Sequence, residues 1–369
     1  MTAIRRSLKI FVLTLMIGLG AAIGITVAGQ RLLDGPDAPE SRVVDGFLSG
    51  KFVRLSAGSW LDDGIRQLKL IERKQIGGDT VVLGSSRVMP IDASAFQGQK
   101  FFNHAVSGAM LGDHIALFEQ AVSVNKIPAS VILGIDPWIF GPTNSGTQWR
   151  SLAFYYQVAA WKLSLDRRNV IASGLNYIVL RFLSFDSLLR AAKALIFENE
   201  TDLERRFVFT DKPFSGADVY RPDGSVKHYY RKSFQSTLDR YRKFRNLPRM
   251  ANYVGLDPVQ SSLLRQFVFW MKRLNVQVLL FLPPYHPIVL NELRKSGEIS
   301  QLIEIEETVR MIAAQTGAQV VGGYDKDKEL CDRSEFNDAD HPNLFCLKKY
   351  IGLNQANVEG RNKMRLAPR

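Results

Sequence analysis

The sequence predicts a mixed α/β domain in which a parallel sheet is covered by helices, and two observations support this fold class. Short apolar runs of strand length end at a glycine or a polar turn, at residues 81–84, 100–105 and 131–135. Segments with apolar residues at helical spacing separate these runs, and the same alternation resumes from residue 258. Because strands and helices alternate at this rhythm, we expect a parallel sheet of βα units.

The first half of this domain follows from three strands and two helices. A helix is expected over residues 61–74, where apolar side chains recur at helical spacing. It leads into the first strand at 81–84, and a second strand follows at 100–105 before a Ser-Gly turn. The next helix begins near residue 112 and carries its apolar side chains on one face. The run at 131–135 is then the third strand.

The second half repeats the pattern after a long interruption. A helix over 258–274 has one apolar stripe, and the buried strand 276–282 follows it directly. A helix at 302–315 and a strand at 318–321 come next. A last helix near 347–355 completes the domain, which we therefore place at residues 61–356 with a basic tail at 357–369.

The interruption runs from about residue 141 to 256, where the chain is basic and aromatic and lacks the βα alternation. We interpret it as a largely helical insertion, with amphipathic helices over 155–165 and 175–197 and a turn at 220–225. Aromatic and basic side chains alternate between 229 and 245. They suit stacking on sugars or binding of an acidic glycan, although a solvated helix with an apolar face explains the same pattern.

The N-terminus carries a membrane signal. Arg5, Arg6 and Lys9 precede an uncharged apolar run over residues 10–29, which is about the length needed to span a bilayer. We interpret residues 1–30 as an uncleaved transmembrane signal anchor with its N-terminus in the cytoplasm, because the positive charge lies before the span. A cleaved signal peptide is the alternative. Either interpretation exports the rest of the chain.

Residues 31–60, which contain Pro36 and Pro39, are predicted to be a tether between the anchor and the domain. The formal net charge of the chain is +12. Since an exported protein rarely meets nucleic acid, we expect anionic lipid head groups or an acidic surface polymer as partners, and no nucleic acid. A basic surface that is merely solvated is the alternative.

The two cysteines, Cys331 and Cys346, gain meaning from this predicted export. An exported pair can form a disulfide, which would bracket a loop containing Asp338 and His341. Two unpaired thiols are the alternative. No Cys/His cluster has the spacing of a zinc site, and the Gly-Ser-Ser after the first strand lacks the lysine of a phosphate-binding loop. We therefore expect no metal and no cofactor.

Ser86 is the leading candidate for a catalytic residue. It follows the first strand and Gly84, where open α/β sheets place their reactive groups. A serine nucleophile needs a general base, and the base needs a carboxylate that orients it. Among the five histidines, His341 stands out because Asp338 precedes it by three residues on a loop.

These motifs together resemble the SGNH/GDSL hydrolases. Gly84-Ser85-Ser86 is similar to the first block of that family, although Ser85 stands where an Asp is usual. Residues 103–108 are similar to the second block, and Asp338 with His341 matches the last. The resemblance covers residues 80–355 without the insertion. It implies a flavodoxin-like α/β/α fold and a triad in which Asp338 and His341 activate Ser86.

The third block departs from the family pattern. It usually reads Gly-x-Asn and supplies an amide to the oxyanion hole, whereas this chain has Asp136 at that position. An ionised carboxylate only accepts hydrogen bonds and would repel an oxyanion. The hole is therefore expected to use the backbone N–H groups of Ser86 and Gly108 and the side chain of Asn103. Asp136 itself is then protonated, or binds a substrate hydroxyl, or merely begins an Asp-Pro turn.

Three further residues are candidates for substrate binding. Arg87 is suited to gripping an anionic group, and Trp138 follows the third block. His286 lies after the strand at 276–282, where it would line the pocket or replace His341 as the base. A surface ion pair is the alternative for Arg87.

The N-terminal span brings the chain closer to one branch of the family, the membrane-anchored proteins resembling DltD, AlgJ and AlgX. That branch implies a bacterial inner-membrane location with an extracytoplasmic catalytic domain. It also implies O-acylation of a cell-envelope polysaccharide or exopolysaccharide, anionic or neutral, through a Ser86 acyl-enzyme. A membrane-bound O-acyltransferase would be the partner that donates the acyl group. A carbohydrate esterase with the same triad and a non-catalytic scaffold are the alternatives.

Overall fold

A computed structural model of the chain describes residues 39–56, 61–73, 79–96, 98–141, 146–163, 207–212, 218–227, 255–324 and 330–352, with positions 235, 239, 241, 243 and 250. The predicted anchor, the predicted helix at 175–197 and the basic tail lie outside these residues. So does most of the aromatic and basic stretch between 229 and 245. No helix within the described ranges is long and apolar enough to cross a membrane.

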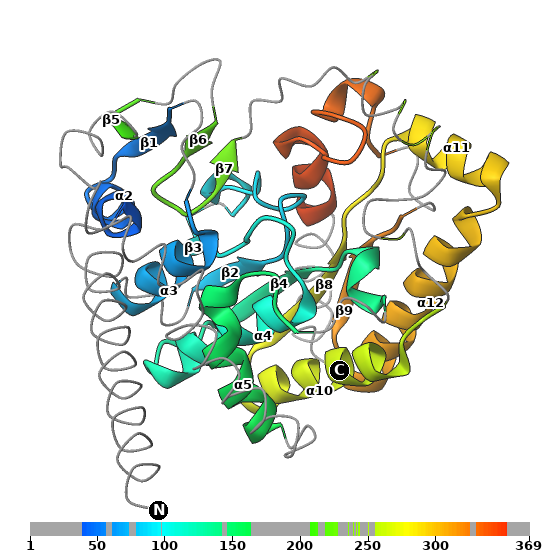
Figure 1. The fold of residues 1–369 in the computed structure, drawn as a ribbon, viewed down its shortest axis with the longest axis horizontal. Helices are drawn as coiled ribbons and strands as arrows, with labels where there is room; N and C mark the ends of the chain where they lie inside the picture. Colours follow the sequence, from blue (N-terminus) through cyan, green and yellow to red (C-terminus); the bar gives the residue numbers. More distant parts are fainter. Residues whose placement is uncertain are drawn as a thin grey trace, which may run out of the picture.

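A five-stranded parallel sheet forms the centre of the domain (Figure 1). Its strands are β3 (Phe101–Asn103), β2 (Thr80–Leu83), β4 (Ser130–Gly134), β8 (Gln277–Leu282) and β9 (Gln319–Gly322), in that spatial order. Counted along the chain, the order of these strands is 2-1-3-4-5, as in doubly wound α/β sheets. All four pairings are parallel, which confirms the predicted βα units.

Alternate side chains of the strands enter two separate cores. In β2, Val81 and Leu83 pack into the larger core together with the apolar faces of helices, whereas Val82 packs into a smaller core on the other face. Because both faces are covered, the strands consist of nearly continuous apolar residues. This is why the sequence pattern located them.

The helices that cover the larger core include α3 (Asp63–Arg73), α4 (Leu111–Ser123), α10 (Pro258–Arg273) and α12 (Ile299–Thr316). The smaller core lies under the turn after β2 and the helical residues 344–352. The layers are thus helix, sheet and helix. The structure adds α11 (Pro287–Ser296), which the sequence analysis missed because its N-cap, His286, sits in a proline-rich run typical of a loop.

The prediction of a tether over residues 31–60 is wrong from Pro39 onwards. Residues in this range form α2 (Pro39–Leu48), which packs on α3, and the strand β1 (Phe52–Leu55). Val43, Val44 and Phe47 are buried in the larger core. Pro39 does not prevent this helix because it is the first helical residue, where a missing N–H costs nothing.

The described part of the insertion contains strands that were not predicted. The helix α5 (Ala153–Lys162) confirms the expected helix at 155–165. The residues described between α5 and residue 256 include three strands, β5 (Phe207–Thr210), β6 (Val219–Tyr220) and β7 (Val226–Lys227). They form an antiparallel sheet with β1 in the order β5-β1-β6-β7. The predicted turn at 220–225 joins β6 to β7, and Gly224 has the positive φ of +80° that this turn needs.

Four short 3₁₀ helices complete the described elements: η1 (Ala93–Ala95), η2 (Pro137–Phe140), η3 (Arg150–Leu152) and η4 (Arg333–Glu335).

Candidate active site

Ser86 lies just beyond the carboxyl end of β2, the strand whose neighbours are β3 on one side and β4 on the other. This is the point at which the strand order reverses, and ligands of open α/β sheets bind there. Gly84 permits the sharp turn, because a Cβ at this position would come within 2.2 Å of a Val88 methyl group. The turn leaves Ser86 partly exposed, while Ser85 and Arg87 on either side are buried.

A chain of hydrogen bonds runs from Ser86 through His341 to Asp338. The Ser86 hydroxyl oxygen is 3.0 Å from His341 Nε2. His341 Nδ1 is 2.9 Å and 3.1 Å from the two carboxylate oxygens of Asp338. The structure thus brings together the three residues that the sequence analysis assigned to a triad, although Ser86 and His341 are 255 positions apart.

The Asp338 carboxylate fixes the tautomer of the imidazole. Burial by itself would raise the pKa of Asp338, but the hydrogen bond and charge of His341 lower it below its usual value, with help from the backbone N–H groups of Asp340 and His341. An ionised carboxylate can only accept hydrogen bonds, so it favours the tautomer in which Nδ1 carries the proton. His341 Nε2 is then free of a proton and can accept that of the serine hydroxyl. This is the arrangement that makes a serine nucleophilic.

The loop that carries Asp338 and His341 is closed by a disulfide between Cys331 and Cys346. Both cysteines are buried in the smaller core. The backbone N–H of Asn337 donates to the carbonyl of His341, which closes a hairpin around the two triad residues. The structure therefore confirms the predicted disulfide.

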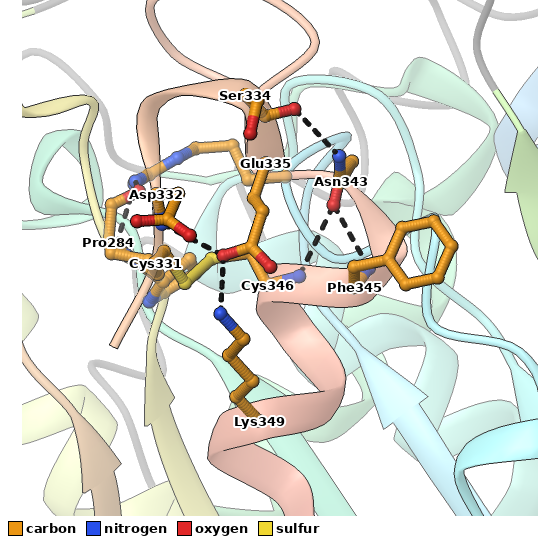
Figure 2. Close-up of a disulfide and its surroundings, with 11 residues drawn as sticks. Pro284, Cys331, Asp332, Ser334, Glu335, Asn343, Phe345, Cys346 and Lys349 are labelled. Atoms are coloured by element: carbon orange, nitrogen blue, oxygen red, sulfur yellow. Dashed lines mark hydrogen bonds and ion pairs between the residues drawn. A yellow bond between two sulfur atoms is a disulfide. The ribbon is translucent and has the colours of Figure 1, made fainter. Parts of the chain in front are cut away.

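Polar contacts fix the same loop to the last helix (Figure 2). The Asn343 side chain accepts hydrogen bonds from the backbone N–H groups of Phe345 and Cys346, and so caps the helical residues 344–352. Lys349, on that helix, forms an ion pair of 2.7 Å with Glu335. The loop is consequently held at both of its ends.

The backbone N–H of Ser86 remains a candidate for an oxyanion hole, and Gly108 lies on a neighbouring loop. Among the described residues, no group accepts a hydrogen bond from the backbone N–H of Ser86. The loop after β3 lies beside this turn, since the N–H of Val106 donates to the carbonyl of Gly84. Gly108, on that loop, is partly exposed and has a positive φ of +59°.

The prediction that the Asn103 side chain donates into the oxyanion hole is wrong. Its amide nitrogen donates to the backbone carbonyls of Val88, Met89 and Ile91 at 2.9 to 3.2 Å, and its side-chain oxygen accepts from the N–H of Ala105. Asn103 is fully buried. It therefore fixes the turn after β2 and has no amide hydrogen to offer a substrate.

The prediction that Arg87 grips a substrate is also wrong. Its side chain is only 1% exposed and forms an ion pair of 3.0 Å with Asp136, which is equally buried. Asp136 is thus neither a substrate ligand nor a simple turn residue. Burial raises the pKa of the Asp136 carboxyl, and the Arg87 guanidinium and the Ser85 hydroxyl oppose that shift.

Trp138 and His286, the other candidates for substrate binding, form contacts within the fold. The indole N–H of Trp138 donates to the carbonyl of Ala109, and the side chain is buried. His286 Nδ1 accepts the backbone N–H of Ile288 at 3.1 Å, and its ring packs edge-on against Phe336. Burial lowers the pKa of His286 to about 4, assisted by the charge of Arg333. His286 is a helix cap, and the imidazole that contacts Ser86 is that of His341.

One group within the described residues has the donor atoms for a metal ion, namely Asp338, Asp340 and His341, whose ligand atoms lie within 4.8 Å of one another. Both ring nitrogens of His341 already have partners, Ser86 on one side and Asp338 on the other. The hydrogen bonds therefore favour proton transfer at this group over metal binding.

No protein-family model matches this chain, and a search of curated proteins finds no match.

Proposed function

We propose that this protein is an exported, membrane-anchored serine acyltransferase that O-acylates, in the first instance O-acetylates, a cell-envelope polysaccharide or exopolysaccharide. The observation that carries the proposal is the continuous hydrogen-bonded chain of Ser86, His341 and Asp338 at the reversal point of the parallel sheet. The order of the sequence blocks, which resembles the SGNH/GDSL hydrolases, supports the same chemistry. The apolar run at residues 10–29 supports export.

The first half-reaction forms an ester on Ser86. His341 Nε2 takes the proton of the hydroxyl while Oγ attacks the acyl carbonyl of the donor. The resulting imidazolium is stabilised by Asp338, and the negative charge on the carbonyl oxygen by backbone N–H groups such as that of Ser86. The carbon–oxygen bond to the donor then breaks, and His341 returns the proton to the leaving group.

The second half-reaction transfers the acyl group to the polymer. A sugar hydroxyl gives its proton to His341 Nε2 and attacks the ester carbonyl, and Ser86 leaves with that proton. In this proposal a membrane-bound O-acyltransferase supplies the acyl donor beside the anchor. Water in place of the sugar hydroxyl would turn the same steps into ester hydrolysis.

The chemistry is tested with the full-length protein in detergent and an activated acetyl ester, p-nitrophenyl acetate. We expect turnover that is lost in Ser86→Ala. Ser94→Ala is the matched control, because Ser94 is an exposed serine on η1, and it should retain the wild-type rate. Equal rates for wild type and Ser86→Ala would remove Ser86 from the mechanism.

The direction of transfer is tested in cells by measuring the acetyl content of surface polysaccharide with and without Ser86→Ala. Acetyl content should fall in the variant if the protein transfers acetyl groups to the polymer. A rise would identify an esterase instead. Unchanged acetyl content, together with an absence of turnover in vitro, would identify a non-catalytic scaffold.

A further inference from the structure

Arg87, the residue directly after Ser86, joins three separate loops through one buried guanidinium group. Its Nη1 donates to Asp136, which follows β4, at 3.0 Å. Its Nη2 donates to the carbonyls of Pro283 and Pro284, which follow β8, at 2.7 Å and 2.9 Å. Its Nε donates to the carbonyl of Asp340 at 3.0 Å.

The bond to Asp340 matters most for the triad, because Asp340 precedes His341 in the chain. The Asp338 carboxylate accepts the backbone N–H groups of Asp340 and His341 at 2.8 Å and 2.9 Å. The short segment that carries the base is therefore held by Asp338 through its N–H groups and by Arg87 through a carbonyl.

The guanidinium is itself held in place. The ring of Tyr285 lies 3.7 Å from its central carbon, which is stacking distance, and Asp136 fixes one end of the group. A planar guanidinium can donate to several acceptors at once in a fixed geometry, whereas a lysine ammonium cannot reproduce that pattern. The number and direction of the four acceptors around this side chain therefore favour arginine over lysine.

We propose that Arg87 and Asp136 are positioning residues, which set the distance between Ser86 and His341. This inference rests on the proposed function. Arg87 extends from the turn that bears the nucleophile and holds the peptide next to the base, so it links the two halves of the site without touching a substrate. Asp136 aims the guanidinium and balances its charge.

The test must separate positioning from stability, because removing one member of a buried ion pair leaves the other charge uncompensated. The informative variant is therefore Arg87→Met/Asp136→Leu, which replaces both charges by apolar side chains of similar size. Arg87→Lys keeps the charge and loses the directed hydrogen bonds. All variants are prepared as the full chain in detergent, and circular dichroism and thermal unfolding establish that they are folded.

The matched control is Arg310→Met/Glu306→Leu. This pair also joins an arginine to a buried carboxylate, at 2.9 Å, and Arg310 also donates to a carbonyl at a strand end, that of Gly322. Both residues lie on α12, and within the described ranges neither has a hydrogen bond to Arg87, Asp136 or residues 338–341. The control variant should retain the wild-type kcat.

With p-nitrophenyl acetate we expect kcat of the Arg87→Met/Asp136→Leu variant to fall about 100-fold, since misplacement of a catalytic group by about 1 Å has effects of this size. KM should change by less than about threefold, because no substrate contact is removed. The kcat of Arg87→Lys should lie between that of this variant and that of wild type. A folded double variant with the wild-type kcat would overturn the proposal.

Hydrogen exchange provides a readout that does not depend on turnover. Amides of residues 338–341 should exchange faster in the Arg87→Met/Asp136→Leu variant than in wild type, and at the wild-type rate in the control pair. Unchanged protection of this loop would contradict the inference even if the wild type proved inactive. Inactivity of the wild type with increased exchange in the variant would refute the proposed function alone.

Discussion

At the scale of single residues, Asp338 illustrates how one carboxylate organises the candidate site. It accepts hydrogen bonds from the imidazole of His341 and from two backbone N–H groups of its own loop. The same carboxylate thereby orients the ring, selects its tautomer and shapes the turn that carries it. These roles cannot be separated by removing the side chain, so a subtler substitution is needed.

Asp338→Asn is that substitution. An amide keeps the size of the side chain but can present an N–H to Nδ1, which favours the wrong tautomer of His341. We expect kcat with p-nitrophenyl acetate to fall on the order of 10³- to 10⁴-fold, with little change in KM. Asp332→Asn, an exposed position on the same loop, should be neutral. Equal rates for Asp338→Asn and wild type would exclude Asp338 as the orienting carboxylate.

His114 makes stability depend on pH. It is fully buried on α4, and neither ring nitrogen has a hydrogen-bond partner in the part of the chain that the structure describes. Burial lowers the pKa of His114 from 6.5 to about 3. Below pH 6.5 His114 therefore binds a proton in the unfolded chain but stays neutral in the folded chain. The free energy of unfolding consequently decreases as the pH falls from 6.5 towards 3.

The measurement is the urea midpoint of wild type and His114→Leu at pH 7.5 and pH 5, two values on either side of the ordinary histidine pKa. The midpoint of the wild type should drop more than that of the variant, because leucine has no proton to bind. Identical drops would mean that His114 is not buried as a neutral imidazole.

At the scale of elements, the disulfide and the loop it closes form one unit with the last helix. The loop spans 15 positions between Cys331 and Cys346, and a closed loop of this length stabilises a protein by roughly 3 kcal/mol. Cys331→Ala/Cys346→Ala should lower the melting temperature accordingly. It should also lower kcat, since His341 lies within the loop. Reducing agent should reproduce both effects in wild type and leave the variant unchanged. A loss of stability without a loss of kcat would show that the hairpin around residues 337–341 holds His341 without the disulfide.

The central sheet could be predicted because each of its strands is recognisable from the apolar character of its own residues. Residues such as Val131 and Ile132 lie in short apolar runs, and burial on both faces explains those runs without reference to the rest of the chain. The second sheet could not be predicted in this way. Its strands β6 and β7 have two residues each, and β1 finds its partners more than 150 positions away.

In the candidate site, too, some residues could be predicted from local sequence and others could not. Ser86, His341 and Asp338 belong to short motifs whose chemistry is evident from residue type and spacing, so they could be found before the structure. Burial is a property of the whole fold, and arginine is seldom buried. The sequence therefore suggested an exposed role for Arg87, and its partnership with Asp136 emerged only from the structure.

At the scale of the whole molecule, the net charge of +12 bears on the choice of polymer. If basic surface attracts an acidic polysaccharide, its affinity should fall steeply between about 50 mM and 500 mM salt, as screening shortens the range of the attraction. Binding of a neutral polysaccharide should change little over the same range. Titration of both polymers at several salt concentrations measures this. Salt-independent binding of the acidic polymer would exclude a role for the charge.

The separation of Ser86 from His341 also governs when in the life of the chain chemistry can begin. Ser86 is synthesised early, whereas His341 lies in the final tenth of the sequence and cannot contact Ser86 before that part of the chain has been made. A nascent or prematurely terminated polypeptide therefore has a hydroxyl of ordinary reactivity. If the chain after the predicted anchor crosses a membrane in sequence order, Ser86 crosses before His341, so the hydrogen-bonded chain of Ser86, His341 and Asp338 cannot form until residue 341 has crossed as well.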